Sequence, residues 1–328
     1  MNRNIFNRFK SNAKEFKDSG LSNQVGYQSS RLLNKNGQFN VNRTGTNRWL
    51  QLSLSHELIT MQWRKFIPLV IGTYIFLNLI FATLYYFIGM DQFMGTIVKS
   101  KWDEFLEAFF FSAQTITTVG YGRTNPVGLL PNILASFEAL FGLLVISIIT
   151  GLMYGRFARP VVHLLFSENA LISPFLNGKA LMFRLANSKT NDLAEVEAQV
   201  LLSMVIYDGR NYSRKYFNLD LERKNVNALA LSWTLVHPIT ETSPMFEFTP
   251  EMMQEFEAEI LVTIKGFDTT FSQVVFGRTS YHYSSLVWDA KFRPVFKRSE
   301  DGKETILELD RLNDFEKIIE PASLTLPA

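Results

Sequence analysis

The stretch Thr117-Thr118-Val119-Gly120-Tyr121-Gly122 restricts the fold of this sequence more than any other. Two glycines flank one tyrosine directly after a run of hydroxyl residues. Glycine permits left-handed backbone angles, so such a loop is able to turn its carbonyl oxygens in one direction. Four such loops around a common axis would stack rings of oxygens that replace the hydration shell of a potassium ion. A glycine-rich turn that happens to contain a tyrosine is the alternative, and the flanking sequence decides between them.

The composition indicates a membrane part joined to a soluble part. Apolar residues make up 47% of the 328 residues, yet 20% are charged, and the length suffices for two domains. The net charge of +2 argues against a nucleic-acid partner, because a nucleic-acid-binding protein would carry a larger basic excess. The chain has no cysteine and its four histidines are widely scattered, so we expect no metal site and no cofactor.

The N-terminal region is predicted to stay in the cytoplasm. Residues 1–47 are rich in Asn, Ser, Lys and Arg and are expected to form a polar, mostly extended arm. Over residues 1–65 there are eleven Lys and Arg against three acids, and such an excess before a first span indicates the cytoplasmic side. Residues 48–65 are predicted to form an amphipathic helix in the membrane interface, with a surface helix on a soluble core as the alternative. Its apolar residues recur at helical spacing between Trp49 and Trp63: Leu50, Leu54, Leu58 and Met61.

Two long apolar runs predict two membrane spans within a pore domain over residues 66–159. Residues 66–88 carry no charge, and residues 132–154 carry only Glu138, so both are long enough to cross the hydrocarbon core. An acid inside a span seldom faces lipid, so Glu138 should turn toward the short helix predicted between the two runs or toward another buried partner. Basic residues flank the inner ends of both runs: Arg64, Lys65, Arg156 and Arg159.

Between the spans, residues 103–117 are predicted to form a helix that is too short to cross a bilayer. Such a helix would be re-entrant, which is allowed only where protein surrounds it. Asp103 and Glu104 complement the positive end of its dipole, so its negative end would point toward the bilayer centre. A cation at that place would be stabilised.

The apolar period changes after about residue 180. Further strand-like runs occur over residues 212–221, 229–236, 260–266, 271–276 and 305–309, with turn signals at Asp208-Gly209 and Lys265-Gly266. We therefore predict a cytoplasmic, all-β, immunoglobulin-like sandwich with a regulatory role over residues 160–328. The clearest strand is marked by strict alternation of apolar residues: Val196, Ala198, Val200, Leu202, Met204 and Ile206.

Two spans, a re-entrant helix and a TVGYG loop together describe the pore module of a potassium channel. Three further segments resemble the bacterial inward-rectifier potassium channels: Arg156-Phe157-Ala158-Arg159-Pro160, Leu231-Ser232-Trp233-Thr234-Leu235-Val236-His237-Pro238-Ile239 and Arg278-Thr279-Ser280-Tyr281. The resemblance covers roughly residues 45–300. It implies a passive potassium channel, not an enzyme, in the bacterial inner membrane, with both termini in the cytoplasm and potassium as the permeant ion. One chain carries one loop, so a homotetramer is expected.

The resemblance also implies roles for individual residues. Carbonyls of Thr118, Val119, Gly120 and Tyr121 would line the ion sites of a filter that ends at Gly122. Tyr154 falls where the family places a bulky residue that narrows and gates the inner pore; a lipid-facing anchor is the alternative. Glu197 matches an acid that lines the cytoplasmic pore and would concentrate cations there. Four basic residues sit where related channels bind anionic phospholipid headgroups, with simple positive-inside charge as the alternative: Arg64, Lys65, Arg156 and Arg159.

The sequence departs from the eukaryotic relatives at several positions. Ile146 stands where they keep an acid that holds polyamines, which argues against strong rectification from that site. Gln114 occupies the position of the glutamate that pairs with an arginine to hold the filter, and Arg123 follows the filter one place early. Val161-Val162-His163 replaces their basic cluster, which argues against phosphoinositide activation.

A membrane-anchored receptor that does not conduct, with a sandwich that binds a cytosolic partner, is the alternative function. An anchor needs neither a re-entrant helix nor TVGYG, so the sequence favours the channel. A non-selective cation channel would be expected to lose the Tyr-Gly end of the loop.

Overall fold

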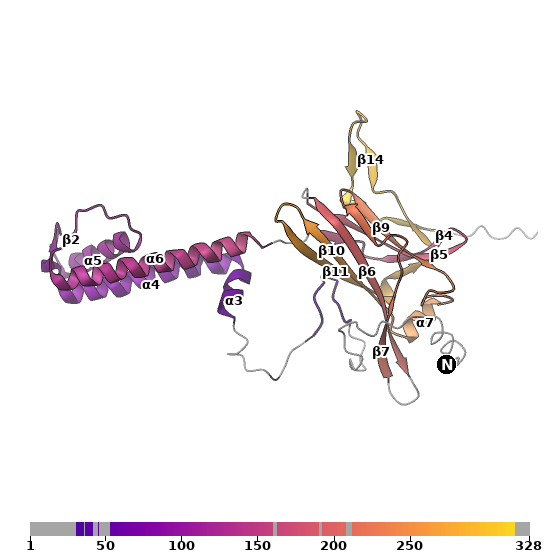
Figure 1. Ribbon diagram of the computed structural model, residues 1–328, viewed down its shortest axis with the longest axis horizontal. Helices are drawn as coiled ribbons and strands as arrows, with labels where there is room; N and C mark the ends of the chain where they lie inside the picture. Colours follow the sequence, from indigo (N-terminus) through magenta and orange to yellow (C-terminus); the bar gives the residue numbers. More distant parts are fainter. Residues whose placement is uncertain are drawn as a thin grey trace, which may run out of the picture. The chain divides into compact units, whose positions relative to one another are not determined.

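The computed structural model describes residues 31–35, 37–41, 45, 53–159, 163–189, 192–207 and 212–318. It divides into two compact units, one at Thr44–Arg159 and the other at Met1–Arg43 with Pro160–Ala328. We call them the helical unit and the sandwich unit (Figure 1). Several expectations concern residues outside the described ranges: most of the polar arm, the start of the interfacial helix with Trp49 and Leu50, Val161-Val162, and the turn at Asp208-Gly209.

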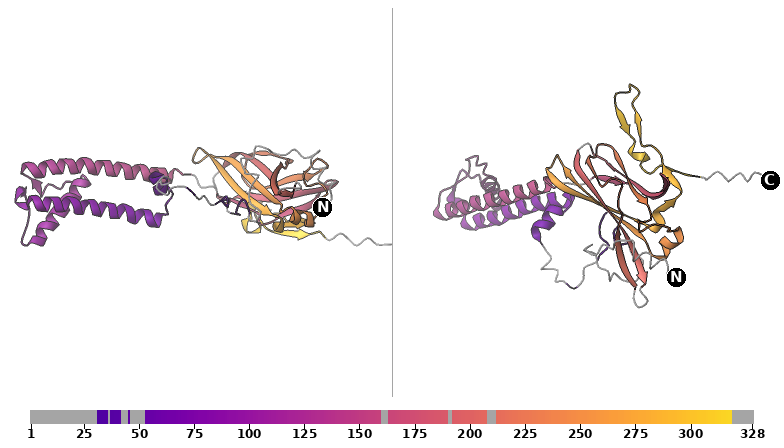
Figure 2. Two further views of the ribbon diagram at one scale, coloured as in Figure 1. Left: turned by 90° about the horizontal axis from the view of Figure 1, so that it is seen from below. Right: turned by 45° about the vertical axis from the view of Figure 1, so that its right-hand side comes forward.

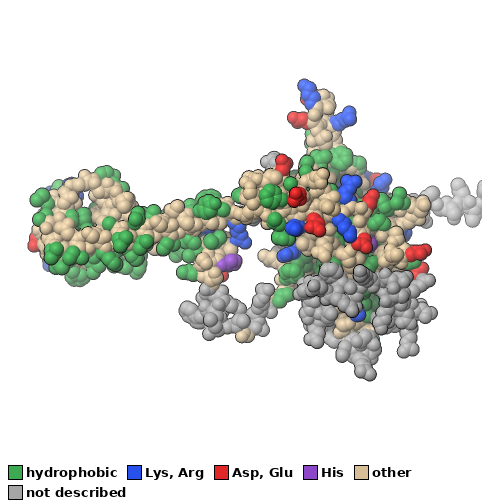
Figure 3. Space-filling model, in the orientation of Figure 1, with side chains coloured by type: hydrophobic (Ala, Val, Ile, Leu, Met, Phe, Trp, Pro, Cys, Tyr) green, Lys and Arg blue, Asp and Glu red, His purple; other side chains and the backbone are tan. Residues whose placement is uncertain are grey.

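Two long helices form the frame of the helical unit. They are α4 (Trp63–Ile88) and α6 (Leu129–Phe157), and both are long and apolar enough to cross a membrane, which confirms the two predicted spans. Figure 2 shows them side by side, with α5 (Lys101–Ile116) packed against them at one end. Charged side chains are sparse on the face of this unit that Figure 3 shows, as expected for a surface in contact with lipid or with other apolar protein.

The helix that was expected at the membrane interface is shorter than the predicted range of residues 48–65. Among the described residues it is α3 (Leu54–Thr60), with Ser53 accepting a hydrogen bond from the His56 backbone N–H as its N-cap. Met61 and Gln62 have extended ψ angles of 144° and 143°, which end α3 and begin α4. Helical spacing of apolar residues continues across this break, so the pattern alone did not reveal it.

Two five-stranded sheets make the sandwich unit. The order in one is β11-β10-β6-β7 with β8 also on β6, and in the other β12-β4-β5-β3 with β9 also on β5. Their bounds are β3 (Leu164–Phe166), β4 (Ala170–Phe175), β5 (Gly178–Asn187), β6 (Leu193–Tyr207), β7 (Tyr212–Asn218), β8 (Asn225–Ala228), β9 (Ser232–Ile239), β10 (Glu259–Asp268), β11 (Gln273–His282) and β12 (Leu286–Trp288). The described part of the chain therefore has the predicted order of an α-helical unit followed by an all-β unit.

Smaller elements complete both units. In the helical unit, η1 (Met90–Gln92) precedes β1 (Phe93–Met94), which pairs with β2 (Asn125–Pro126). In the sandwich unit, β13 (Ala290–Phe292) pairs with β16 (Phe315–Lys317), and β14 (Phe296–Arg298) forms a protruding hairpin with β15 (Thr305–Leu307) (Figure 1). The remaining elements are α7 (Pro250–Glu255), η2 (Tyr283–Ser285) and η3 (Leu309–Arg311).

The core of the sandwich follows the alternation seen in the sequence. Every second residue of β6 from Val196 to Ile206 is at most 5% exposed, and these side chains share a cluster with those of Ile260 on β10 and Phe183 on β5. Strand ends were predicted less well. Lys265-Gly266 is not a turn: it lies inside β10, where the pairing with β6 shifts register. A bulge and a turn both use glycine, so the dipeptide did not distinguish them.

Part of the N-terminal arm is packed on the sandwich unit. Leu32 and Leu33 are buried against Tyr216 and Leu261. The buried carboxylate of Glu259 accepts hydrogen bonds from the backbone N–H groups of both leucines, at 3.0 and 3.5 Å. This stretch of the arm is therefore an anchored segment and not only a solvated one.

Candidate ion-coordinating site

The loop after α5 begins as a helix cap. The N–H of Thr118 donates to the carbonyl of Thr115 at 3.1 Å, and the N–H of Val119 donates to that of Gln114 at 3.0 Å. These two bonds make a Schellman motif, whose left-handed position is usually glycine. Thr118 holds that position here, with φ of 57°, although a left-handed conformation costs a non-glycine residue roughly 1–2 kcal/mol. The cap engages the N–H groups at the start of the loop and makes no use of their carbonyl oxygens.

From Thr118 onward the backbone alternates in hand. Thr118, Gly120 and Gly122 have φ of 57°, 54° and 81°, whereas Val119 and Tyr121 between them keep negative φ. Alternation of this kind directs successive carbonyl oxygens to one side, unlike a strand, where they point to opposite sides. A Cβ added at Gly120 or Gly122 would meet nothing within 4 Å of the same chain. The backbone angle, and not a lack of space, is therefore what requires glycine at both positions.

A buried polar network holds the C-terminal half of α5 against the two long helices. The carboxylate of Glu138 on α6 accepts hydrogen bonds from the Tyr85 hydroxyl of α4 and the Ser112 hydroxyl of α5, both at 2.5 Å. The Ser112 hydroxyl also lies 3.1 Å from Oδ1 of Asn78, and all four side chains are buried. The expectation that Glu138 turns toward the short helix is confirmed, while Tyr85, Asn78 and Ser112 carried no sequence signal for this role.

One turn further along α6, a glycine lets the helix approach the end of α5. A Cβ added at Gly142 would lie 2.9 Å from the carbonyl oxygen and 3.0 Å from the Cα of Ile116. Such distances are too short for a real side chain, so α6 reaches the start of the loop only because residue 142 is glycine. Gly142 contacts Ile116, and Glu138 contacts Ser112. Because the members of each helix are four residues apart, the two contacts lie one turn apart along the same interface between α5 and α6.

The far end of the loop is tied back to α5 by an ion pair. Nη2 of Arg123 donates to both carboxylate oxygens of Glu107, at 2.8 and 2.7 Å, and the Thr124 hydroxyl donates to the same group at 3.3 Å. The Asn125 side-chain amide donates to the Gly122 carbonyl at 2.7 Å. The sequence shows that Gln114 replaces the glutamate that pairs with an arginine in the eukaryotic relatives. It does not reveal that Glu107 is the partner of Arg123.

The four basic residues near the inner ends of the helices fall into two groups. Arg64, Lys65 and Arg159 are exposed. Arg156 instead lies against its own unit, where its guanidinium donates to the carbonyls of Leu58, Ile59 and Met61 at 2.5, 3.2 and 2.6 Å. Its planar group also stacks 4.4 Å from the ring of Trp63 and 4.2 Å from that of Phe66. Tyr154, one turn before the end of α6, is 75% exposed within a single chain.

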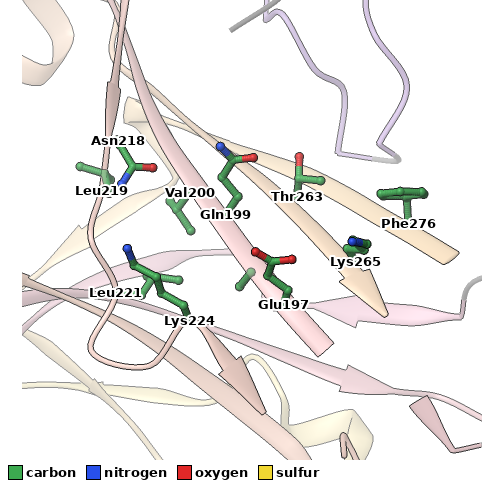
Figure 4. Close-up of a pocket in the computed structure, with 11 residues that line it drawn as sticks. Glu197, Gln199, Val200, Asn218, Leu219, Leu221, Lys224, Thr263, Lys265 and Phe276 are labelled. Carbon is green, nitrogen blue, oxygen red and sulfur yellow. The ribbon is translucent and has the colours of Figure 1, made fainter. Parts of the chain in front are cut away.

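Glu197 lies on the outer face of the first sheet, opposite a lysine. It is paired in register with Lys265 of β10, and both side chains line a cavity of about 330 Å³ with Gln199, Lys224 and Phe276 (Figure 4). Directly opposed side chains on antiparallel strands have Cβ atoms about 5 Å apart. The negative charge of Glu197 is therefore partly offset by Lys265, a residue that the sequence predicts to lie in a turn.

Comparisons with known proteins agree with both units. Residues 164–325 match the model of the inward rectifier potassium channel C-terminal domain, and residues 73–158 match that of an ion channel. The chain is 35% identical over 280 residues to the inward rectifier potassium channel Kirbac3.1 of Paramagnetospirillum magnetotacticum, covering 84% of this chain and 92% of the relative. The chain belongs to the inward rectifier potassium channel family.

Relatives in this family also come from mammals. The ATP-sensitive inward rectifier potassium channel 15 of Rattus norvegicus is 29% identical, with 86% of this chain and 76% of the relative covered. The G protein-activated inward rectifier potassium channel 1 of Homo sapiens is 27% identical, with 82% and 58% covered. Inward rectifier potassium channels are passive transporters, not enzymes, and combine a two-span membrane part with a cytoplasmic β-sandwich. Both parts are present in this chain.

Proposed function

We propose that this chain forms a homotetrameric channel that selects potassium with the carbonyls of Thr118, Val119, Gly120 and Tyr121. The observation that carries the proposal is the alternating backbone at residues 118–122, which begins on the cap of α5. One chain supplies one side of such a site, so four loops are needed to surround an ion. The exposed side chains of Val119 and Tyr121 support the same assembly, because neighbouring chains would cover them.

Tyr154 is proposed as the inner gate of this pore. Its ring is exposed within one chain and lies near the end of α6 opposite the filter, so four rings around the axis would narrow the path. Arg64, Lys65 and Arg159 are proposed to contact anionic phospholipid headgroups. Arg156 is proposed to hold α3 against α6 instead, since its guanidinium is already bonded to the carbonyls of α3 and of the residue after it.

The orientation of the channel follows from its charges. We propose that it lies in the bacterial inner membrane with both termini in the cytoplasm, because basic residues gather before the first span and after the second. Glu197 would then face the cytoplasmic part of the ion path, where its field acts on arriving cations.

Rubidium uptake tests conduction most simply. The purified protein is reconstituted into potassium-loaded liposomes, and uptake of radioactive rubidium is followed with and without barium. The proposal predicts uptake that barium blocks. Absence of uptake from liposomes that contain assembled protein, or uptake that survives barium, would contradict it. Repeating the assay across anionic lipids tests the proposed headgroup contacts.

A further inference from the structure

We infer that the Glu107–Arg123 ion pair is a brace that positions the outer end of the filter and thereby contributes to its selectivity. The inference rests on the proposed function, because it assigns a role within that filter. Arg123 is joined covalently to Gly122, the last residue of the alternating backbone. Any displacement of residue 123 therefore passes directly into the backbone angles of the filter.

The carboxylate of Glu107 is the fixed side of the brace. It lies in the second turn of α5 and its side chain is 13% exposed, whereas that of Arg123 is 50% exposed. A carboxylate with so little contact with solvent needs compensating donors. Arg123 and Thr124, two consecutive residues after the filter, supply them through three hydrogen bonds. The helix that caps the start of the filter thus also holds its end.

A second contact holds the same residue from the other side. Nη1 of Arg123 donates to the Gly95 carbonyl at 3.4 Å. A Cβ added at Gly95, which has φ of 83°, would lie 1.7 Å from the backbone oxygen of Arg123. The loop before α5 therefore packs against the Arg123 backbone as closely as glycine allows. Pairing of β1 with β2 begins two residues later, at Asn125.

The brace matters because it adds to one other restraint at this end of the filter, the hydrogen bond from the Asn125 side-chain amide to the Gly122 carbonyl. Gly122 has a left-handed backbone and no neighbouring atom within 4 Å of a would-be Cβ, so side-chain packing within the chain does not restrain it. The carbonyls of the filter select an ion only while their positions are maintained. Restraint at residue 123 supplies what packing at residue 122 does not.

Three variants and one control distinguish the effect of the ion pair from the effect of removing any charge at this end of the helical unit. Glu107→Gln and Arg123→Gln each remove one side of the pair, and the double variant Glu107→Arg with Arg123→Glu exchanges the two charges. Asp91→Asn is the matched control: Asp91 is an exposed carboxylate in η1, at the same end of the helical unit, with no ion pair among the residues that the structure describes. Potassium-to-sodium permeability ratios are measured in planar bilayers, and assembly is checked by size-exclusion chromatography and thermal unfolding.

Each single variant is expected to lower the permeability ratio about tenfold while the tetramer still assembles, and the exchanged pair to recover to within about threefold of wild type. Asp91→Asn should keep the wild-type ratio. A wild-type ratio in Glu107→Gln, an equal loss in Asp91→Asn, or no recovery in the exchanged pair would each overturn the brace. If Glu107→Gln does not assemble, Arg123→Gln decides, because its side chain is half exposed. A wild-type protein that does not conduct would overturn the proposed function first, whereas a selective wild type with unaffected variants overturns the brace alone.

Discussion

Gly120 has a left-handed φ of 54° in open space, so its identity is set by the backbone and not by crowding. Thr118 shows the opposite case, because a β-branched residue occupies the same region at the place where α5 is capped. Strain of roughly 1–3 kcal/mol at such positions is found where function requires it. At this scale the alternating hand of the backbone at residues 118–122 is the observation that supports the proposed row of aligned carbonyls.

Gly120→Asp tests that assignment. An aspartate strains the left-handed position and places a charge beside the ion sites, so we expect potassium selectivity to be lost while assembly is largely kept. The matched control is Gly151→Ala, because Gly151 also has open space around it but lies within α6. Permeability ratios measured in planar bilayers should fall toward one for the first variant and stay unchanged for the second. An unchanged ratio in Gly120→Asp would remove the filter assignment.

Sequence reasoning succeeded where one residue type had one explanation. TVGYG indicated the loop, and Glu138 had to find a buried partner because lipid offers none. It failed where the partner depended on three-dimensional approach. Glu107 is sixteen residues from Arg123 and nothing in its local sequence distinguishes it from Glu104, so only the packed structure identifies which acid meets the arginine.

At the scale of elements, α6 makes one close contact with α5 and another with α3. Gly142 brings α6 against the end of α5, close to the proposed filter, and Arg156 joins the end of α6 to α3. The proposed filter and the proposed gate thus lie near opposite ends of α6. Apolar periodicity predicted α4, α5 and α6 to within about one turn, but it did not predict the break at Met61 and Gln62.

Tyr154→Ala should raise the open probability of single channels by about threefold or more, because four smaller side chains no longer constrict or dewet the inner pore. Leu129→Ala serves as the control: Leu129 is also 75% exposed but lies at the other end of α6. Single-channel recordings provide the measurement. An open probability that is unchanged or reduced in Tyr154→Ala would favour the alternative, a tyrosine that anchors the helix at the lipid interface.

The sandwich unit should lose stability in acid through His237. Nδ1 lies 2.6 Å from the Asp220 carbonyl, and Nε2 lies 2.7 Å from the Ser243 hydroxyl, so the ring is bonded on both sides. Burial lowers the pKa of His237 below 6.5, against the opposing effect of the Asp220 carbonyl. The unfolded chain then binds a proton more readily than the folded one, so this contribution to stability is present above about pH 6.5 and is lost as the pH falls.

Thermal unfolding of the full protein at pH 7.5 and pH 5.0 measures that loss. Wild type should lose at most about 1.4 kcal/mol per pH unit through this one histidine. His237→Asn keeps a donor for the Asp220 carbonyl but does not titrate, so its midpoint should fall less between the two pH values. His56→Asn, at an exposed histidine, should behave as wild type. Equal losses in wild type and His237→Asn would contradict the assignment.

At the scale of the whole molecule, the two units differ in the charge on their surfaces. Charged side chains are sparse on the face of the helical unit that Figure 3 shows, whereas acids and bases are interspersed on that face of the sandwich unit. A tetramer would place four copies of each charge around the ion path. Lys265 would then reduce the negative charge of Glu197 at four places. The sequence predicted the acid by resemblance, but not its basic neighbour, since the register of β6 with β10 cannot be derived from either strand alone.

Lys265→Gln should strengthen block by a multivalent organic cation applied to the sandwich side. A positive charge of the blocker held at Glu197 would lie about 5 Å from the charge of Lys265, and in water their repulsion is worth ~0.8 kcal/mol. Removing the lysine charge should therefore raise the blocker's apparent affinity about fourfold at low salt. The increase should shrink at high ionic strength. Lys224→Gln is the matched control, because Lys224 lines the same cavity but is paired with Asp220 at 3.2 Å. An equal increase for both lysines would show that Lys265 has no special relation to Glu197.

The claim on which the others depend is that the alternating backbone at residues 118–122 makes a potassium-selective pore. The most direct test is the reversal potential of the purified wild-type protein in a planar bilayer, with potassium salt on one side and an equal concentration of sodium salt on the other. A potassium-selective pore should give a reversal potential far from zero, of the sign set by potassium leaving its own side. A reversal potential at zero in a conducting bilayer would contradict it.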